Sequence, residues 1–170
     1  MSLVALSGQE VPDGSGLTYN LFGDPVVGGA GQIAFAANLS NGGQGLYLSS
    51  PWGFKTIAVT GQPAPGTSAA FQVFYDAGMI NTGGQQAFAA SAGGDNGVWA
   101  VDSSGALSLV AIAGQTVAVD GGLRTIASVS MNGATGGQDG MPRTLNEDGQ
   151  LVVVLQFVDG SSGLFTAYLP

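Results

Sequence analysis

An internal threefold repeat constrains the fold of this chain more than any other feature. An apolar segment ending in Gly-Gln occurs at residues 4–9, 57–62 and 110–115, with successive copies 53 residues apart. A second motif, at residues 31–37 and 84–90, has the same spacing, and its third copy at 149–153 is displaced by 65 residues. A third motif follows at 45–47, 97–99 and 163–165. The sequence predicts one repeat domain over 1–170, with units over about 4–56, 57–109 and 110–170 and an insert over about 131–143.

Each motif has the composition of a β-strand, and glycine interrupts the chain too often for long helices. Large apolar residues between the first two motifs recur every 52 residues, as Tyr19, Phe71 and Leu123 and as Phe22, Phe74 and Ile126. In the second unit, strands are expected over 56–60, 71–75, 87–92 and 98–101. A turn at 102–105 is predicted to join the last of these in a hairpin with a strand over 107–112, and residues 51–54 occupy the same hairpin position one unit earlier. Each unit is therefore predicted to be a four-stranded antiparallel meander.

The central strand of each unit indicates how the units pack. Neither face is polar in Ala34-Phe35-Ala36-Ala37 or in Ala87-Phe88-Ala89-Ala90. A sheet with one wet face alternates apolar with polar residues, so this strand is expected to be covered on both sides. Phe35 and Phe88 are predicted core residues.

Stacked four-stranded sheets are typical of β-propeller blades, and a propeller closes with about four or more of them. The predicted fold is all-β, with three propeller-like blades that form a partial propeller or a 3+3 assembly of two chains. Three blades leave open sheet edges, which favour self-association or contact with neighbouring repeats. The alternative is a β-trefoil, in which three units close on themselves.

Composition excludes several classes of function. The 170 residues include no Cys and no His, which removes thiol and imidazole chemistry. Eleven acidic and three basic residues give a net charge of −8, the wrong sign for nucleic acid or an anionic lipid surface. No apolar run reaches the roughly 18 residues that a membrane span needs, so no membrane insertion is expected. The first twenty residues lack the pattern of a signal peptide.

The repeat resembles a known pattern. Asn81-Thr82-Gly83-Gly84-Gln85-Gln86-Ala87-Phe88 resembles the Asn-x-x-Gly-x-x-Ala-Phe repeat of bacterial secreted or surface-anchored tandem-repeat proteins, and residues 61–66 match that family's Gly-x-x-x-Pro-Gly turn. The first unit has Gly28 in place of the Asn, and the third has Val152-Val153 in place of Ala-Phe. The resemblance implies an extracellular or cell-surface setting and no established activity, so it supplies no catalytic residues.

Acidic loops are the candidate metal ligands. Carboxylate oxygens are what calcium prefers, and the insert with its flank holds Asp139, Glu147 and Asp148. No segment has the regular Asp spacing of an EF-hand loop, and Asp and Asn beside Gly are also ordinary turn residues. The sequence therefore predicts no cofactor, and calcium at these three acids is the alternative.

Two further sets of residues are candidates for chemistry. Asp24 and Asp76 occupy equivalent positions and are the acids that glycoside hydrolysis would use, but a repeated acid is more simply a turn or capping residue, so no enzyme activity is expected. Trp52 and Phe54 lie in a predicted hairpin tip and offer a platform for sugar binding, whereas Tyr47 and Trp99 share a core position with Phe165.

The sequence predicts a non-enzymatic, extracellular structural or adhesive β-repeat module. The alternative is a carbohydrate-binding module that uses the loop aromatics Trp52 and Phe54, with a glycan as its partner and calcium as an additional ligand.

Overall fold

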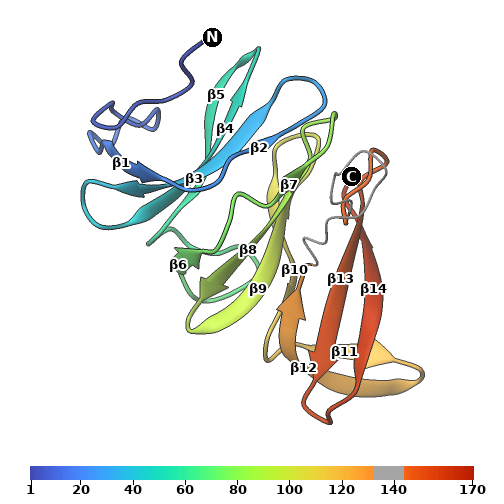
Figure 1. Cartoon of the computed structure of the whole chain (residues 1–170). Helices are drawn as coiled ribbons and strands as arrows, with labels where there is room; N and C mark the ends of the chain where they lie inside the picture. The colour runs from blue at the N-terminus through green and yellow to red at the C-terminus, as the bar shows by residue number, and fades with distance from the viewer. Residues whose placement is uncertain (132–143) are drawn as a thin grey trace.

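A computed structural model describes residues 1–131 and 144–170, and every regular element within them is a β-strand (Figure 1). The strands form three antiparallel sheets that follow one another along the chain. The first contains β1 (Tyr19–Phe22), β2 (Val26–Val27), β3 (Ile33–Leu39), β4 (Gln44–Ser50) and β5 (Gly53–Val59). The second contains β6 (Phe71–Phe74), β7 (Met79–Ile80), β8 (Gln86–Ala92), β9 (Asp95–Val101) and β10 (Leu107–Ile112). The third contains β11 (Thr116–Val119), β12 (Gly122–Ser130), β13 (Gln150–Phe157) and β14 (Ser162–Tyr168).

The predicted fold class, all-β with propeller-like antiparallel sheets, is confirmed. The first two sheets have the strand orders β1-β3-β4-β5 and β6-β8-β9-β10, and the short strands β2 and β7 pair with β3 and β8. The described residues contain no helix that could span a membrane.

The sheets and the sequence repeats are out of phase. The segment that opens the second repeat is part of β5 and pairs with β4 of the first sheet. The segment that opens the third repeat is part of β10 and pairs with β9 of the second sheet. A meander whose first strand was 56–60 was therefore the wrong grouping, because the Pro51–Trp52 and Asp102–Gly105 turns fold each opening segment back onto the strand before it.

The core lies between successive sheets. Phe88 is fully buried in a cluster with Ala34 and Leu46 of the first sheet, and its neighbour Ala87 is fully buried in a cluster with Val153 of the third. The central strand of the second sheet is thus covered on both faces, as predicted. Burial of one Phe side chain is worth about 1.5–3 kcal/mol, so this strand anchors both interfaces.

Phe35, the counterpart of Phe88, lies in the first sheet. Phe35 is 4% exposed although no sheet precedes its own in the described chain. Its ring lies 5.9 Å from Tyr19, 5.5 Å from Tyr47 and 5.7 Å from Phe54, measured between ring centroids. Aromatic rings of the same sheet therefore bury Phe35, and Phe71 and Phe74 pack around Phe88 in the same way, at 6.2 and 5.9 Å between ring centroids.

Two expectations from the sequence were wrong. No described strand pairs across two of the three sheets, so the units do not close a common trefoil barrel.

The second expectation concerns the register of the third unit. The third-unit counterpart of Tyr19 and Phe71 is Ile126, not Leu123. The carbonyls of Tyr19, Phe71 and Ile126 each accept a hydrogen bond of 2.8 Å from the glycine of the first motif, whereas Leu123 is 77% exposed. The longer β11–β12 hairpin shifts the spacing in this unit. The predicted insert lies outside the described residues except for Met131.

The Asn-x-x-Gly motif is a turn that leads into the central strand. The Asn81 side chain accepts a hydrogen bond from the Gln85 amide (3.0 Å), and the Asn146 side chain accepts one from the Gln150 amide (2.8 Å). Gly84 has a φ of 82°, in the left-handed region that glycine adopts without strain. The residue types of this motif are thus explained by turn geometry.

Candidate functional site

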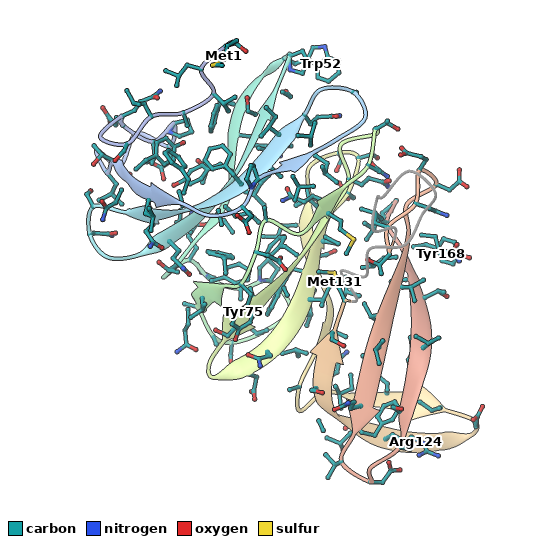
Figure 2. The ribbon with its side chains drawn as sticks, in the orientation of Figure 1. Met1, Trp52, Tyr75, Arg124, Met131 and Tyr168 are labelled. Atoms are coloured by element: carbon teal, nitrogen blue, oxygen red, sulfur yellow. The ribbon has the colours of Figure 1, made fainter. Side chains whose placement is uncertain are left out.

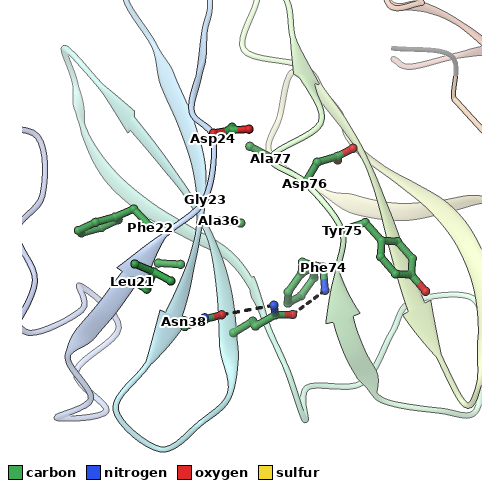
Figure 3. A pocket seen from close by; sticks show the side chains of 12 residues that line it. Leu21, Phe22, Gly23, Asp24, Ala36, Asn38, Phe74, Tyr75, Asp76 and Ala77 are labelled. Atoms are coloured by element: carbon green, nitrogen blue, oxygen red, sulfur yellow. Dashed lines mark hydrogen bonds between the residues drawn. The ribbon is translucent and has the colours of Figure 1, made fainter.

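A cleft of about 210 Å³ lies between the first and second sheets (Figure 3). One wall carries residues of β1 and β3, and the other carries the end of β6 and the residues that follow it. Gln44 joins the two walls, because its side-chain oxygen accepts a hydrogen bond of 2.9 Å from the Phe74 amide while its nitrogen donates one of 3.4 Å to Asn38.

Asp24 and Asp76 both line this cleft, and Figure 3 shows them on opposite walls near one end. The Asp76 carboxylate accepts a hydrogen bond of 2.9 Å from the Gly78 amide, which makes it the cap of a turn. Loss of water around the carboxyl raises the pKa of Asp76, against the opposing effect of backbone hydrogen bonds from Gly78 and Ala89. The contacts of Asp76 are those of a turn-capping residue, which is the role that the sequence predicts for this repeated acid.

The β4–β5 hairpin places the two candidate aromatic residues in different surroundings. Trp52 is 81% exposed at the tip, as Figure 2 shows, and the Ser50 hydroxyl holds the turn by accepting from the Trp52 amide (3.3 Å) and donating to the Gly53 carbonyl (3.1 Å). Phe54 is half-buried in the aromatic cluster around Phe35. Trp52 is therefore the aromatic side chain of the pair that solvent reaches freely.

A second cleft, of about 270 Å³, begins beside Trp52 and runs between the first two sheets. Lys55 and Asp102 also line it. The Lys55 ammonium donates a hydrogen bond of 3.2 Å to the Gly105 carbonyl. Hydrogen bonds from the Ser104 hydroxyl and from the Ala106 amide lower the pKa of Asp102, so this carboxylate is ionised at neutral pH. An exposed indole, a cation and an anion are the groups that can stack on a sugar ring and bind its hydroxyls.

Sequence reasoning did not find Lys55 or Asp102. They belong to two hairpins, β4–β5 and β9–β10, that occupy the same place in successive sheets. The spacing of 50 residues between Lys55 and its acceptor Gly105 is close to one repeat. Equivalent turns of stacked repeats lie side by side, and this rule would have placed Asp102 next to the Trp52 hairpin.

The predicted calcium ligands are only partly placed by the structure. Asp139 lies outside the described residues. The Glu147 carboxylate accepts hydrogen bonds from the amide and the hydroxyl of Thr82, in the equivalent turn of the second sheet. Asp148 is exposed in the same turn as Glu147. Within residues 1–131 and 144–170 no three acidic side chains gather as a metal site, and calcium binding stays a prediction.

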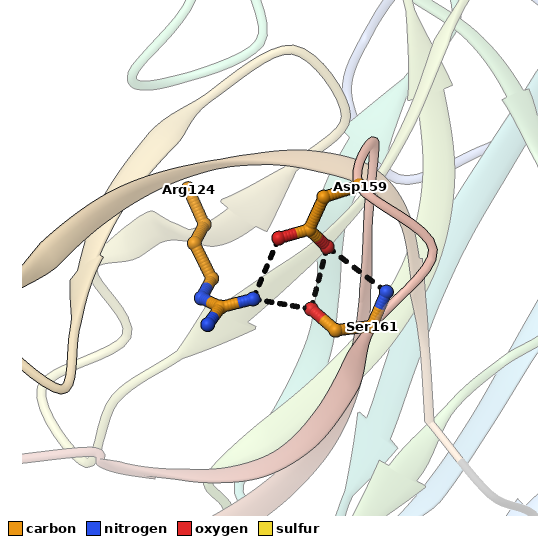
Figure 4. Close-up of polar contacts among 3 residues, drawn as sticks. All are labelled: Arg124, Asp159 and Ser161. Carbon is orange, nitrogen blue, oxygen red and sulfur yellow. Dashed lines mark hydrogen bonds and ion pairs between the residues drawn. The ribbon is translucent and has the colours of Figure 1, made fainter.

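One ion pair lies on the third sheet (Figure 4). The Arg124 guanidinium donates to Asp159 and to the Ser161 hydroxyl, both at 2.6 Å, and lies 5.8 Å from the centre of the Phe157 ring. The Ser161 hydroxyl is the largest cause of the lowered pKa of Asp159. Because both charged side chains keep solvent contact, the pair contributes little to stability and serves to fix the β13–β14 turn.

Comparisons with known proteins place the chain in a family. Neither the curated proteins nor the solved structures contain a match to it. A model of a protein family, described as a family of unknown function (DUF7453), matches residues 1–169. The chain therefore belongs to the DUF7453 family.

Proposed function

We propose that the protein is a non-enzymatic, extracellular structural or adhesive module built from stacked β-repeats. The observation that carries this proposal is the way successive sheets meet. Ala34 and Leu46 of the first sheet pack on the face of the second that carries Phe88, and Ala87 and Val98 of the second pack on the third. Equivalent residues form both interfaces, so the unit is suited to build an extended scaffold.

The charge and composition support an extracellular role without nucleic acid. The net charge of −8 opposes binding to phosphate backbones. The low proportion of charged residues, 8%, resembles that of secreted bacterial scaffolds. The proposed partner is another copy of the module or a neighbouring repeat.

Self-association tests this proposal. We expect the molar mass of the 170-residue chain, measured by light scattering on a size-exclusion column, to rise with protein concentration. A panel of glycoside substrates should show no hydrolysis. A chain that stays monomeric at every concentration would contradict the scaffold role, and hydrolysis lost in Asp76→Asn would instead identify an enzyme.

A second function, carbohydrate binding, is favoured by the exposed Trp52 beside the cleft that holds Lys55 and Asp102. A glycan array tests it. Reproducible binding should disappear in Trp52→Ala and persist in Tyr75→Ala, which removes an aromatic ring that is 53% exposed elsewhere on the surface. Binding that survives Trp52→Ala would exclude this cleft.

A further inference from the structure

The segment that opens each repeat has the same local structure in all three copies. The residue two positions before its glycine donates its amide hydrogen to the Gln side chain three positions later, and the glycine amide donates to the strand that follows. The first of these hydrogen bonds is 3.1 Å from Leu6, 3.2 Å from Val59 and 3.3 Å from Ile112. The second is 2.8 Å in each unit.

Only the first copy of this segment lacks a strand partner. Ala58 lies opposite Leu46, and Ala111 lies opposite Val98, in the outer pairs of the first two sheets. Their counterpart Ala5 precedes the first described strand and pairs with none of the strands in the described chain. Residues 4–9 thus contain a formed turn and a strand-like segment that pairs with none of the described strands.

The third sheet lacks the complementary element. β14 corresponds to β4 and β9, but no described strand pairs with its outer edge. Exposure at one position that β4, β9 and β14 share shows the effect of the missing strand. Leu46 and Val98 are both 0% exposed there, whereas Leu164 is 75% exposed. Figure 2 shows Tyr168, which is 71% exposed, projecting from the same strand.

The sheet faces at the two ends are also complementary. The outward face of the third sheet carries Leu164 and, paired with it across the ladder, the half-buried Val154. At the other end, the first sheet has an apolar hollow of about 310 Å³ whose lining includes Val4, Phe22 and Phe35. This hollow lies over the Phe35 face, and the equivalent Phe88 face of the second sheet receives Ala34 and Leu46.

We propose that residues 3–6 of a second copy add to β14 as an antiparallel strand and complete the third sheet. The two interior joints fix the register: Ala5 lies opposite Leu164 and Leu6 opposite Gly163, with Val4 at the bulge that both interior pairs show one residue earlier. The third sheet of one copy then stacks on the Phe35 face of the next.

The occupant is a second copy because residues 3–6 cannot reach β14 of their own chain. Figure 1 shows the N-terminus beside the first sheet and β14 in the last sheet, at opposite ends of the array. A contact between two different surfaces is heterologous, so it generates a ring where the rotation closes and a filament where it does not. This joint deepens the proposed scaffold function and rests on it.

Directed cross-linking tests the joint, since the chain has no Cys. Ala5→Cys chains and Leu164→Cys chains carrying tags of different size are mixed and treated with a short bis-maleimide. A covalent heterodimer should form in the mixture, and neither variant alone should form a dimer. The control replaces Leu164→Cys by Val158→Cys, at a residue that is 71% exposed in the β13–β14 turn, and should give no product.

The outcomes separate the joint from the scaffold role. An associated chain that yields no heterodimer, or in which Ala5→Cys dimerises alone, overturns the joint and leaves the scaffold role standing. A chain that never associates contradicts both.

A charge substitution provides an independent measurement. Leu164→Arg should weaken self-association at least tenfold and leave the unfolding temperature of the monomer unchanged, because this side chain is exposed in the single chain. Leu123→Arg, at a leucine of similar exposure, should associate like the parent chain. Equal association of the two variants would overturn the proposal.

Discussion

At the scale of single residues, the first sheet contains three buried hydroxyl groups without a hydrogen-bond partner in the described chain. One is on Thr56, and the other two are tyrosine hydroxyls. They belong to Tyr19 and Tyr47, whose rings meet edge to face with 5.0 Å between centroids. Burial, reinforced by the charge of Asp13, raises the pKa of Tyr19 to about 12, and burial also raises the pKa of Tyr47. The equivalent Trp99 does have a partner, since its indole N–H donates to the Pro65 carbonyl at 3.0 Å.

Tyr47→Phe should therefore stabilise the protein or leave its stability unchanged. Leaving a buried polar group unsatisfied costs about 1–3 kcal/mol, and the substitution removes that group while keeping the ring. Trp99→Phe should do the opposite, because it deletes a hydrogen bond and leaves a cavity. Denaturant unfolding measures both variants, with Tyr168→Phe at an exposed position as control. A loss of more than about 1 kcal/mol in Tyr47→Phe would show that the hydroxyl has a partner.

The carboxyl group of Asp76 makes the stability of the folded protein depend on pH, and the direction of this dependence follows from its raised pKa. Since the folded state raises the pKa of this carboxyl above its ordinary value, the folded state binds the proton more tightly than the unfolded state does. The contribution of Asp76 to stability therefore decreases as pH rises between the unfolded and the folded pKa.

Asp76→Asn should remove this decrease and raise the unfolding temperature at pH 7 relative to the parent chain. The Asn side chain can still accept the hydrogen bond from the Gly78 amide. Asp102→Asn is the control with the opposite sign, because the folded state lowers the pKa of Asp102. Thermal melts between pH 3 and 7 follow both variants, and a parent-like profile for Asp76→Asn would refute the assignment.

At the scale of strands, the sequence predicted where the strands occur better than it predicted which sheet each strand joins. The repeat and the absence of polar residues around Phe35 and Phe88 located the central strands and their two covered faces. The hairpins at 102–105 and 51–54 were also predicted and are confirmed. Only the assignment of residues 56–60 to the second sheet failed, since the boundary of a sequence repeat need not coincide with the boundary of a sheet. The cleft beside Trp52 was missed for a related reason: Lys55 and Asp102 meet only because equivalent hairpins of adjacent sheets lie side by side.

The out-of-phase arrangement predicts where the chain can be cut. A fragment of residues 1–115 keeps β10, which covers the edge of β9, whereas a fragment of residues 1–105 loses it. Both fragments lack the third sheet and expose the same face of the second, so their difference reports β10 alone. We expect 1–115 to unfold cooperatively and 1–105 to lose several kcal/mol, since Ala111, Ile112 and a full ladder of hydrogen bonds are removed.

Circular dichroism during urea unfolding measures the two fragments. A fragment of residues 1–121, which extends 1–115 into the β11–β12 hairpin without completing it, is the control for chain length and should behave like 1–115. Equal stability of 1–105 and 1–115 would mean that the second sheet does not need the strand that the third repeat supplies.

At the scale of the whole molecule, net charge opposes the self-association of two copies, whereas exposed apolar surface favours it. Each copy carries a net charge of −8, so two copies repel one another at low ionic strength. The proposed joint itself is uncharged: residues 3–6 contain only Leu, Val and Ala, and the facing side chains include Val154 and Leu164. Salt therefore screens the repulsion without weakening the contact.

Raising NaCl from about 10 mM to about 150 mM shortens the Debye length from about 30 Å to about 8 Å and should lower the dissociation constant by roughly two- to tenfold. Sedimentation equilibrium at several protein concentrations measures the constant, and Leu164→Arg should remain dissociated at both salt concentrations. Association that weakens with salt would indicate that ion pairs join the copies.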